Sequence, residues 1–188
     1  MARAGVTVER LTEAAAELAD EIGFENVTVS AVARRFGVTV PSLYSHVRNV
    51  EELRVKTALL ALEELADRVA EAIAGRSGKD ALIAFAGAYR DYAREHPGRY
   101  AAARVRLDYE TAAKSAAVRH SQMTRALLRG YGLPESEENH AVRMLSSTLH
   151  GFVELEAAGG FDLSPGIEAS WTKTLEVLDL ALTHWPRD

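Results

Sequence analysis

The 188-residue sequence contains no cysteine, few prolines and no long apolar run. Without cysteine the chain can form neither a disulfide nor a thiolate metal site, and nothing points to an oxidising compartment. Apolar runs such as Ala58–Leu62 are far shorter than the ~20 residues of a membrane-spanning helix, and the segment before Leu11 lacks the apolar stretch of a signal peptide. We therefore expect a soluble, cytoplasmic protein that does not contact a membrane.

Hydrophobic residues make up 47% of the sequence, which is enough to fill a core, and the formal net charge is −5. An acidic balance counts against a nucleic-acid partner, because affinity for phosphate comes mainly from Lys and Arg. The local distribution of charge matters more than the sum. Residues 27–50 contain Arg34, Arg35 and Arg48 and no Asp or Glu, so this segment alone is basic and free of acids.

The apolar residues recur at intervals of three and four without a sustained period of two, so the sequence predicts an all-α protein. Capping residues divide it into about nine helices. These expected helices span about residues 7–23, 29–36, 40–47, 50–74, 80–96, 100–107, 108–131, 134–158 and 164–185.

Two of the shortest expected helices follow each other closely. Thr28 and Thr39 are placed to cap them, and Gly37 tolerates the positive φ that ends the first. Pro41 falls in the first turn of the second, where its missing N–H needs no partner, and Asn49 caps the long helix that follows. This order is a helix-turn-helix, so we expect such a domain at residues 1–48 and a C-terminal helical bundle at residues 49–188.

A recognition helix must be short, bury one face and present polar or aromatic side chains on the other. In the expected third helix Leu43 and Val47, four residues apart, form the buried pair. The exposed side then carries Thr39, Pro41, Ser42, Tyr44, Ser45 and His46. Tyr and His can donate to phosphate, Ser can reach a phosphate or a base edge, and Pro41 or Val40 can contact a thymine methyl. The alternative is that the aromatic residues only pack within the fold.

At these residues the sequence resembles the TetR/AcrR family of transcription regulators. The resemblance covers about residues 7–53 and is carried by Gly37-Val38, Leu43-Tyr44-Ser45-His46-Val47 and Val50-Glu51-Glu52-Leu53. It implies that Thr28 and Ser30 bind phosphate, that Thr39, Val40, Pro41, Ser42 and Ser45 face bases, and that Tyr44 and His46 hold the DNA backbone. Val50 stands where the family often has Lys, and we expect Arg48 to substitute for it.

The C-terminal part carries a weaker resemblance. The run Leu149–Glu156 is similar to the His-Gly-centred WHG module of a TetR subgroup, although the Trp expected before His150-Gly151 is absent. His150 and Glu154 lie one helical turn apart, but two ligands without a third make a poor metal site. We interpret them as a pair on the helix surface and expect neither a metal nor a cofactor.

Regulators of this kind act as dimers, because one short helix reads too few bases. We expect the last two helices to form the dimer interface, where Gly151 allows close approach and the final helix offers a wide apolar surface. The residues expected there are Gly151, Trp171, Leu175, Leu178 and Leu182. The alternative is that these residues belong to the chain's own core.

A pocket for a small-molecule effector is expected between the remaining C-terminal helices, with an apolar lining and a few polar groups. The candidate residues are Phe85, Tyr89, Tyr92, Arg104, Arg106, Met144 and Thr148. Tyr89 could equally belong to the core, and Arg104 could pair with an acid on the surface.

These observations predict a homodimeric TetR-type repressor that binds a palindromic double-stranded DNA operator and leaves it when an effector binds. A regulator that activates, or that acts without a ligand, is the first alternative. A helical carrier or enzyme is the second. The sequence offers no Ser-His-Asp set, paired carboxylates or phosphate-binding loop, so we expect no catalysis.

Overall fold

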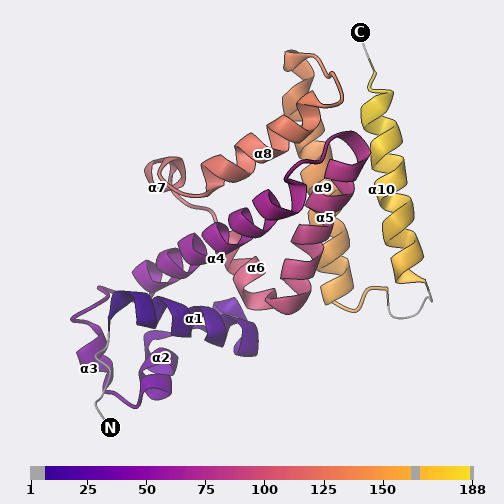
Figure 1. Ribbon diagram of the computed structural model, residues 1–188. Coiled ribbons are helices and arrows are strands. Elements are labelled where there is room, and N and C mark those ends of the chain that lie inside the picture. The colour runs from indigo at the N-terminus through magenta and orange to yellow at the C-terminus, as the bar shows by residue number, and fades with distance from the viewer. Residues whose placement is uncertain (1–6, 162–165, 187–188) are drawn as a thin grey trace. The chain divides into compact units, whose positions relative to one another are not determined.

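The computed structural model describes residues 7–161 and 166–186, and within this part the chain forms ten α-helices, two short 3₁₀ helices and no strand (Figure 1). The predicted all-α class is therefore confirmed. Contacts divide the chain into two compact units. Unit 1 comprises the residues up to 65 together with 95–116, and unit 2 comprises residues 66–94 together with those from 117 onward. The functional boundary that we expect between residues 48 and 49 stays a prediction.

Unit 1 contains the short helices of the N-terminal part. They are α1 (Val8–Ile22), α2 (Val29–Phe36), α3 (Val40–Leu43), the first part of α4 (Val50–Ile73), α6 (Pro97–Ala103) and α7 (Tyr109–Ala113). The expected caps are present at two of these helices: Thr7 accepts from the Arg10 N–H at 3.3 Å and Thr28 from the Ala31 N–H at 3.1 Å. Gly37 ends α2 with a left-handed φ of 64°.

The core of unit 1 is built from the apolar faces of these helices. Leu11 from α1, Val32 from α2, Leu43 from α3 and Leu53 from α4 are all buried in one cluster, together with Val47. Burial of each such side chain stabilises the fold by about 1.5–3 kcal/mol. The helix-turn-helix is therefore held by its own core.

The first turn of α6 lies directly on the backbone of α1. Gly98 is buried there, and a Cβ at this position would lie 1.9 Å from the Ala19 carbonyl oxygen. Beside this contact, the Asp20 carboxylate accepts from the Arg99 backbone N–H at 2.9 Å and lies 3.2 Å from the His96 ring. Only glycine permits so close an approach.

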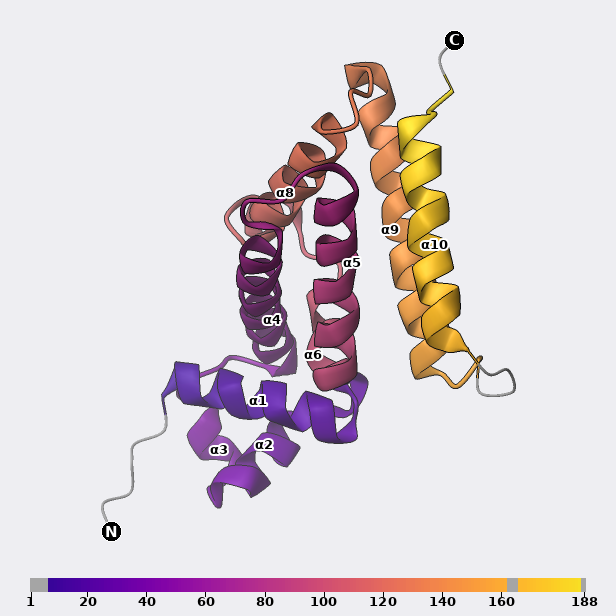
Figure 2. The same ribbon diagram turned by 45° about the vertical axis from the view of Figure 1, so that its right-hand side comes forward.

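Unit 2 contains the rest of α4, from Ala66 onward, and, among its described residues, four further α-helices. They are α5 (Gly78–Glu95, with Arg94 as its last residue in this unit), α8 (Ala117–Arg129), α9 (Glu138–Ala157) and α10 (Ile167–Thr183). Helices α9 and α10 lie side by side and run antiparallel (Figures 1 and 2). Each of the two helices buries residues at helical spacing, such as Leu145 and Leu149 on α9 and Leu175 and Leu182 on α10.

A buried arginine ties this helical pair to α5. Arg90 is only 3% exposed and donates to the carboxylates of Glu156, near the end of α9, and Glu168, at the start of α10. Three of these bonds are 2.8 Å long and the fourth is 3.0 Å. Its guanidinium also lies 4.8 Å from the centroid of the Trp171 ring, and Arg94 donates to the same two carboxylates. We call Arg90, Arg94, Glu156 and Glu168 the arginine clasp.

The structure corrects three predicted helices. The expected single helix over residues 108–131 is two helices, α7 and α8, so the described residues form ten α-helices where the sequence predicts nine. The short helix expected at residues 100–107 begins earlier, at Pro97, and ends at Ala103. The third helix stops at Leu43 instead of Val47. The expected start of the last helix at Ser164 lies outside the described residues.

Within the part of the chain that the structure describes, no helix combines the length and the apolar character that crossing a bilayer would require.

Candidate nucleic-acid interface

The candidate interface begins at α2, whose first turn faces solvent at Thr28 and Ser30. The Thr28 hydroxyl oxygen already caps the helix by accepting from Ala31 N–H, which leaves its own O–H free to donate. The positive end of the α2 dipole adds to the attraction for a phosphate. Both residues are thus exposed, as the sequence predicts.

The expected recognition helix is a single helical turn, α3, continued by a hydrogen-bonded turn through Tyr44, Ser45 and His46. The N–H groups of His46 and Val47 both donate to the Leu43 carbonyl, at 2.9 and 3.0 Å. We call residues 39–46 the reading turn. Leu43 and Val47 are buried, so the predicted inward pair is confirmed and the turn is fixed to the unit-1 core.

Serine hydroxyls explain why the helix stops early. Ser42 donates to the Thr39 carbonyl at 2.6 Å, and Ser45 donates to the Ser42 carbonyl at 2.7 Å. Such bonds compete with the helical hydrogen-bond ladder. The prediction that the Thr39 side chain caps α3 is wrong, because it makes no capping bond.

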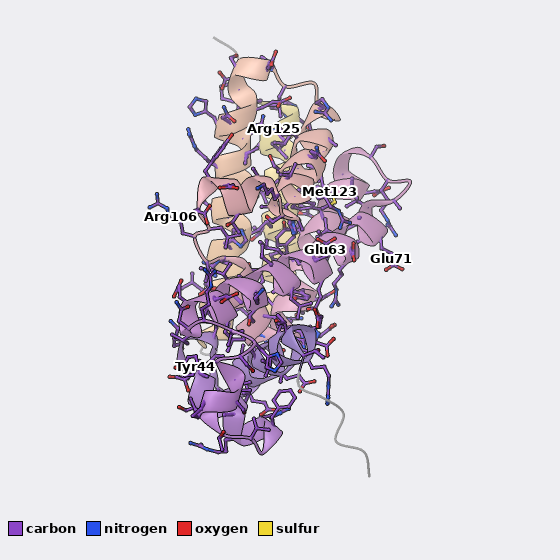
Figure 3. All side chains as sticks on the ribbon, turned by 90° about the vertical axis from the view of Figure 1, so that its left-hand side faces the viewer. Tyr44, Glu63, Glu71, Arg106, Met123 and Arg125 are labelled. Carbon is purple, nitrogen blue, oxygen red and sulfur yellow. The ribbon has the colours of Figure 1, made fainter. Side chains whose placement is uncertain are left out.

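The reading turn presents the expected polar surface. Tyr44 is 52% exposed and its side chain projects from the surface of this region (Figure 3). The other exposed residues are Thr39, Pro41, Ser42 and Ser45, and His46 is half-buried. Val40 is also half-buried and packs against the core, so less of it is available for a thymine methyl than the sequence suggests.

Arg35 and Arg48 both form ion pairs, but the Arg48 side chain is far more exposed. Arg35 donates to Glu21 at 2.7 Å and to Glu17 at 2.8 Å, so α1 neutralises its charge, and these hydrogen bonds raise its pKa. Arg48 is 86% exposed and extends from the junction between the reading turn and α4. Arg48 Nε lies 3.1 Å from Glu52 Oε2, and the rest of its guanidinium is the candidate for a phosphate contact at this end of the reading turn.

Comparison with known proteins agrees with this geometry. Residues 11–55 match the bacterial regulatory proteins of the tetR family, and residues 82–178 match the tetracyclin repressor-like C-terminal domain. YobS of Bacillus subtilis, an uncharacterized HTH-type transcriptional regulator, is 35% identical over 161 residues, which cover 85% of this chain and 84% of YobS. Rv0681 of Mycobacterium tuberculosis, described in the same words, is 36% identical over 156 residues, covering 82% and 72%.

The chain belongs to the TetR family. Among solved structures it is similar to the TetR family protein ActR of Streptomyces coelicolor in complex with (S)-DNPA, with a TM-score of 0.69, 19% identity and coverage of 95% of this chain and 98% of ActR. This likeness concerns the fold. The family and the relatives identify the protein as a DNA-binding transcriptional regulator. The matched C-terminal family is described as tetracyclin repressor-like, so the resemblance to the WHG module stays a prediction.

The effector residues expected in this TetR protein lie in both units. Unit 2 holds Phe85, Tyr89, Tyr92, Met144 and Thr148, whereas Arg104 and Arg106 are exposed residues of unit 1. Arg106 projects into solvent in Figure 3. Arg104 stacks on the Tyr100 ring at 5.4 Å from its centroid.

Within unit 2 the aromatic candidates are brought together. Phe85 and Tyr92 are buried, and the Phe85 and Tyr89 ring centroids are 4.9 Å apart. The Tyr89 hydroxyl lies 2.8 Å from His120 Nδ1, and the His150 ring stands edge-on at 5.9 Å. The sequence analysis missed His120, because no local signal links it to a tyrosine 31 positions away. A surface cleft of about 410 Å³ in the same unit is lined by other residues, including Arg68, Ile83 and Asp91.

The residues expected at the dimer interface need correction. Trp171, Leu175, Leu178 and Leu182 are buried within unit 2 of a single chain, because they form the face of α10 that packs inward. The exposed apolar residues of α10 are Val177 and Leu180. Gly151 on α9 is exposed, and a Cβ there would meet nothing within 4 Å.

Proposed function

We propose that the protein is a homodimeric repressor that binds a palindromic operator through the reading turn. The observation that carries the proposal is the reading turn itself. Leu43 and Val47 fix it to a core, Tyr44 is exposed on it, and its segment of the chain contains no acid. An exposed tyrosine hydroxyl on a turn that is fixed to the core suits a contact with a phosphate backbone.

The dimer is proposed from the geometry of operators. Two recognition elements must be roughly 34–36 Å apart to enter successive major grooves on one face of DNA. Exposed apolar residues on α9 and α10, namely Leu155, Val177 and Leu180, support an interface on these helices. A two-fold axis would then place each helix of the pair against its copy.

The effector is proposed for the aromatic cluster of unit 2, around Phe85, Tyr89 and His120. ActR carries (S)-DNPA in its solved complex, and the family resemblance supports a ligand for this chain as well. To convert a population that is 99% bound to one that is 99% free, the effector must prefer the released state by about 5.5 kcal/mol.

Binding of a labelled duplex from the protein's own promoter region tests the DNA-binding part. Tyr44→Phe removes only a hydroxyl, and we expect about a fivefold loss of affinity, the value of one hydrogen bond. Tyr109→Phe is the matched control, because Tyr109 is 90% exposed on α7, away from the reading turn. Equal affinity for both variants and the wild-type protein contradicts the assigned contact.

Two further measurements separate the alternatives. A reporter driven by the same promoter should rise when the gene is deleted if the protein represses, and fall if it activates. A thermal-shift screen over small aromatic compounds should find one that also lowers DNA affinity. A set of binders that leaves DNA affinity unchanged favours the ligand-independent regulator.

A further inference from the structure

The junction between the reading turn and α4 is built around one carboxylate. Glu52 Oε2 accepts from the backbone N–H of Arg48 at 2.8 Å and from the Arg48 Nε at 3.1 Å. Asn49 completes the junction, since its Oδ1 accepts from the Glu52 N–H at 2.8 Å. One oxygen of Glu52 thus fixes both the main chain and the side chain of Arg48.

This arrangement differs from an ordinary helix cap. In a capping box the acid at the third helical position reaches back to the N–H of the capping residue. Here Glu52 reaches one residue further, past Asn49 to Arg48, and adds the guanidinium to its partners. A requirement for helix capping alone does not explain the bond to Nε.

The terminal nitrogens of Arg48, which would bind a phosphate, are not used by Glu52. Glu52 takes Nε, and within the described residues no hydrogen bond is found for the two terminal nitrogens of Arg48, whose side chain is 86% exposed. Two parallel N–H donors are what a phosphate accepts from a guanidinium. The Arg48 side chain is thus fixed at Nε, while its two terminal nitrogens can donate to another group.

We propose that Glu52 is a positioning residue for DNA binding, which holds Arg48 so that its terminal nitrogens meet a phosphate next to the reading turn. The inference rests on the proposed operator contact of Arg48. An arginine that is ordered before DNA arrives loses less side-chain entropy on binding, which is worth about a threefold to tenfold gain in affinity. The opposing effect is repulsion between the Glu52 carboxylate and the phosphate, and the neighbouring cations Arg48 and Lys56 offset part of that repulsion.

The carboxylate keeps its charge over the useful pH range. Hydrogen bonds from the backbone N–H and the guanidinium of Arg48 hold the pKa of Glu52 below its usual value. Lys56 Nζ, 3.7 Å from the other oxygen, acts in the same direction. Positioning is therefore expected at neutral pH and in mild acid alike.

Salt-dependent binding tests the proposal with four substitutions at residues 48 and 52, each measured against the promoter duplex. Removing one phosphate contact reduces the slope of log affinity against log salt by about 0.9. We expect this reduction for Arg48→Ala. In Glu52→Ala the arginine is present but no longer ordered before binding, so we expect about a threefold to tenfold loss of affinity at fixed salt. Glu52→Asp keeps the charge but is too short to reach both groups, so it should behave like Glu52→Ala. Glu52→Gln keeps an acceptor oxygen and should retain most of the wild-type affinity.

Glu51→Ala is the matched control, because Glu51 lies in the same helical turn without a bond to Arg48. If acids near the DNA merely repel it, Glu51→Ala and Glu52→Ala both bind more tightly, and the proposal is overturned. If Arg48→Ala changes the slope while Glu52→Asp and Glu52→Ala bind the duplex as tightly as the wild-type protein, Glu52 is only a helix cap. If Arg48→Ala itself has no effect, the arginine contact fails while DNA binding through the reading turn stands. A wild-type protein that does not bind the duplex overturns the proposed function as well.

Discussion

At the scale of single residues, glycine matters most where two backbones touch. Gly98 places the first turn of α6 against Ala19 of α1, where a methyl group would overlap the carbonyl carbon and oxygen. We expect Gly98→Ala to lower the free energy of unfolding by about 1–3 kcal/mol, because backbone atoms must move to admit the methyl group. Urea denaturation followed by circular dichroism measures this change.

The control is a glycine in an open helical position. Gly87 lies inside α5 and a Cβ there would meet nothing within 4 Å. Gly87→Ala should raise stability by about 0.5–1 kcal/mol, since alanine loses less backbone entropy in a helix. Replacing glycine by alanine is thus expected to lower the free energy of unfolding at Gly98, which is buried, and to raise it at Gly87, which is half-buried. If Gly98→Ala raises the denaturation midpoint as Gly87→Ala does, the close α1–α6 contact does not exist in solution.

At the scale of elements, local sequence signals predicted most helices. They failed where contacts with residues distant in the sequence determine the structure. The caps Thr7, Thr28 and Asn49 could be identified from sequence, because each bonds to a backbone N–H three residues on. The break between α7 and α8 was missed. There Ser115 donates to the Ala112 carbonyl through both its N–H and its hydroxyl, and this ends α7 within two turns.

The candidate site shows the same division. Exposure on the reading turn could be predicted, because the spacing of Leu43 and Val47 fixes which side is buried. The burial of Trp171 and Leu175 within one chain could not be predicted. An apolar stripe on a helix has the same sequence pattern whether it packs against its own chain or against a second copy. The partners of Arg90 lie 66 and 78 positions away, so no local pattern reveals them.

The arginine clasp carries an element-scale prediction. Arg90→Ala leaves Glu156, which is mostly buried, without its main partner, and breaking a buried pair costs about 3–5 kcal/mol. We expect a loss of stability of this size in thermal or urea denaturation. Lys114→Ala is the control, because it breaks an exposed pair with Glu110 and should change stability by about 0.5 kcal/mol or less. Similar losses for both variants contradict a structural role for the clasp.

The clasp also predicts a pH dependence. Hydrogen bonds from Arg90 and Arg94 lower the pKa of Glu168 to about 2 and also lower that of Glu156. A carboxylate whose pKa is depressed on folding stabilises the protein above its unfolded pKa, and this stabilisation is lost as the pH falls toward the folded value. The difference in melting temperature between wild-type protein and Glu168→Gln should therefore be full at pH 6 and shrink between about pH 4.5 and 2. A constant difference over that range contradicts the ionic character of the clasp.

At the scale of the whole molecule, the proposed dimer depends on residues that a single chain leaves exposed. Leu180 on α10 is 58% exposed, and Val177 lies one turn before it. If a copy covers them, Leu180→Glu removes apolar burial of about 2 kcal/mol and places a carboxylate in the contact. A two-fold interface contains the substitution twice, so association should weaken by at least about 4 kcal/mol, close to a thousandfold.

Light scattering during size-exclusion chromatography measures this change, with the wild-type protein at twice the chain mass of 20.5 kDa and Leu180→Glu at the chain mass. Ile83→Glu is the control, because Ile83 is an exposed apolar residue of α5 in the same unit. The monomeric variant should also bind the promoter duplex far more weakly, because a single chain contacts only one half-site. Its reading turn is unchanged. A monomeric Ile83→Glu beside a dimeric Leu180→Glu would place the interface on α5 instead, and the loss of DNA binding would then follow Ile83.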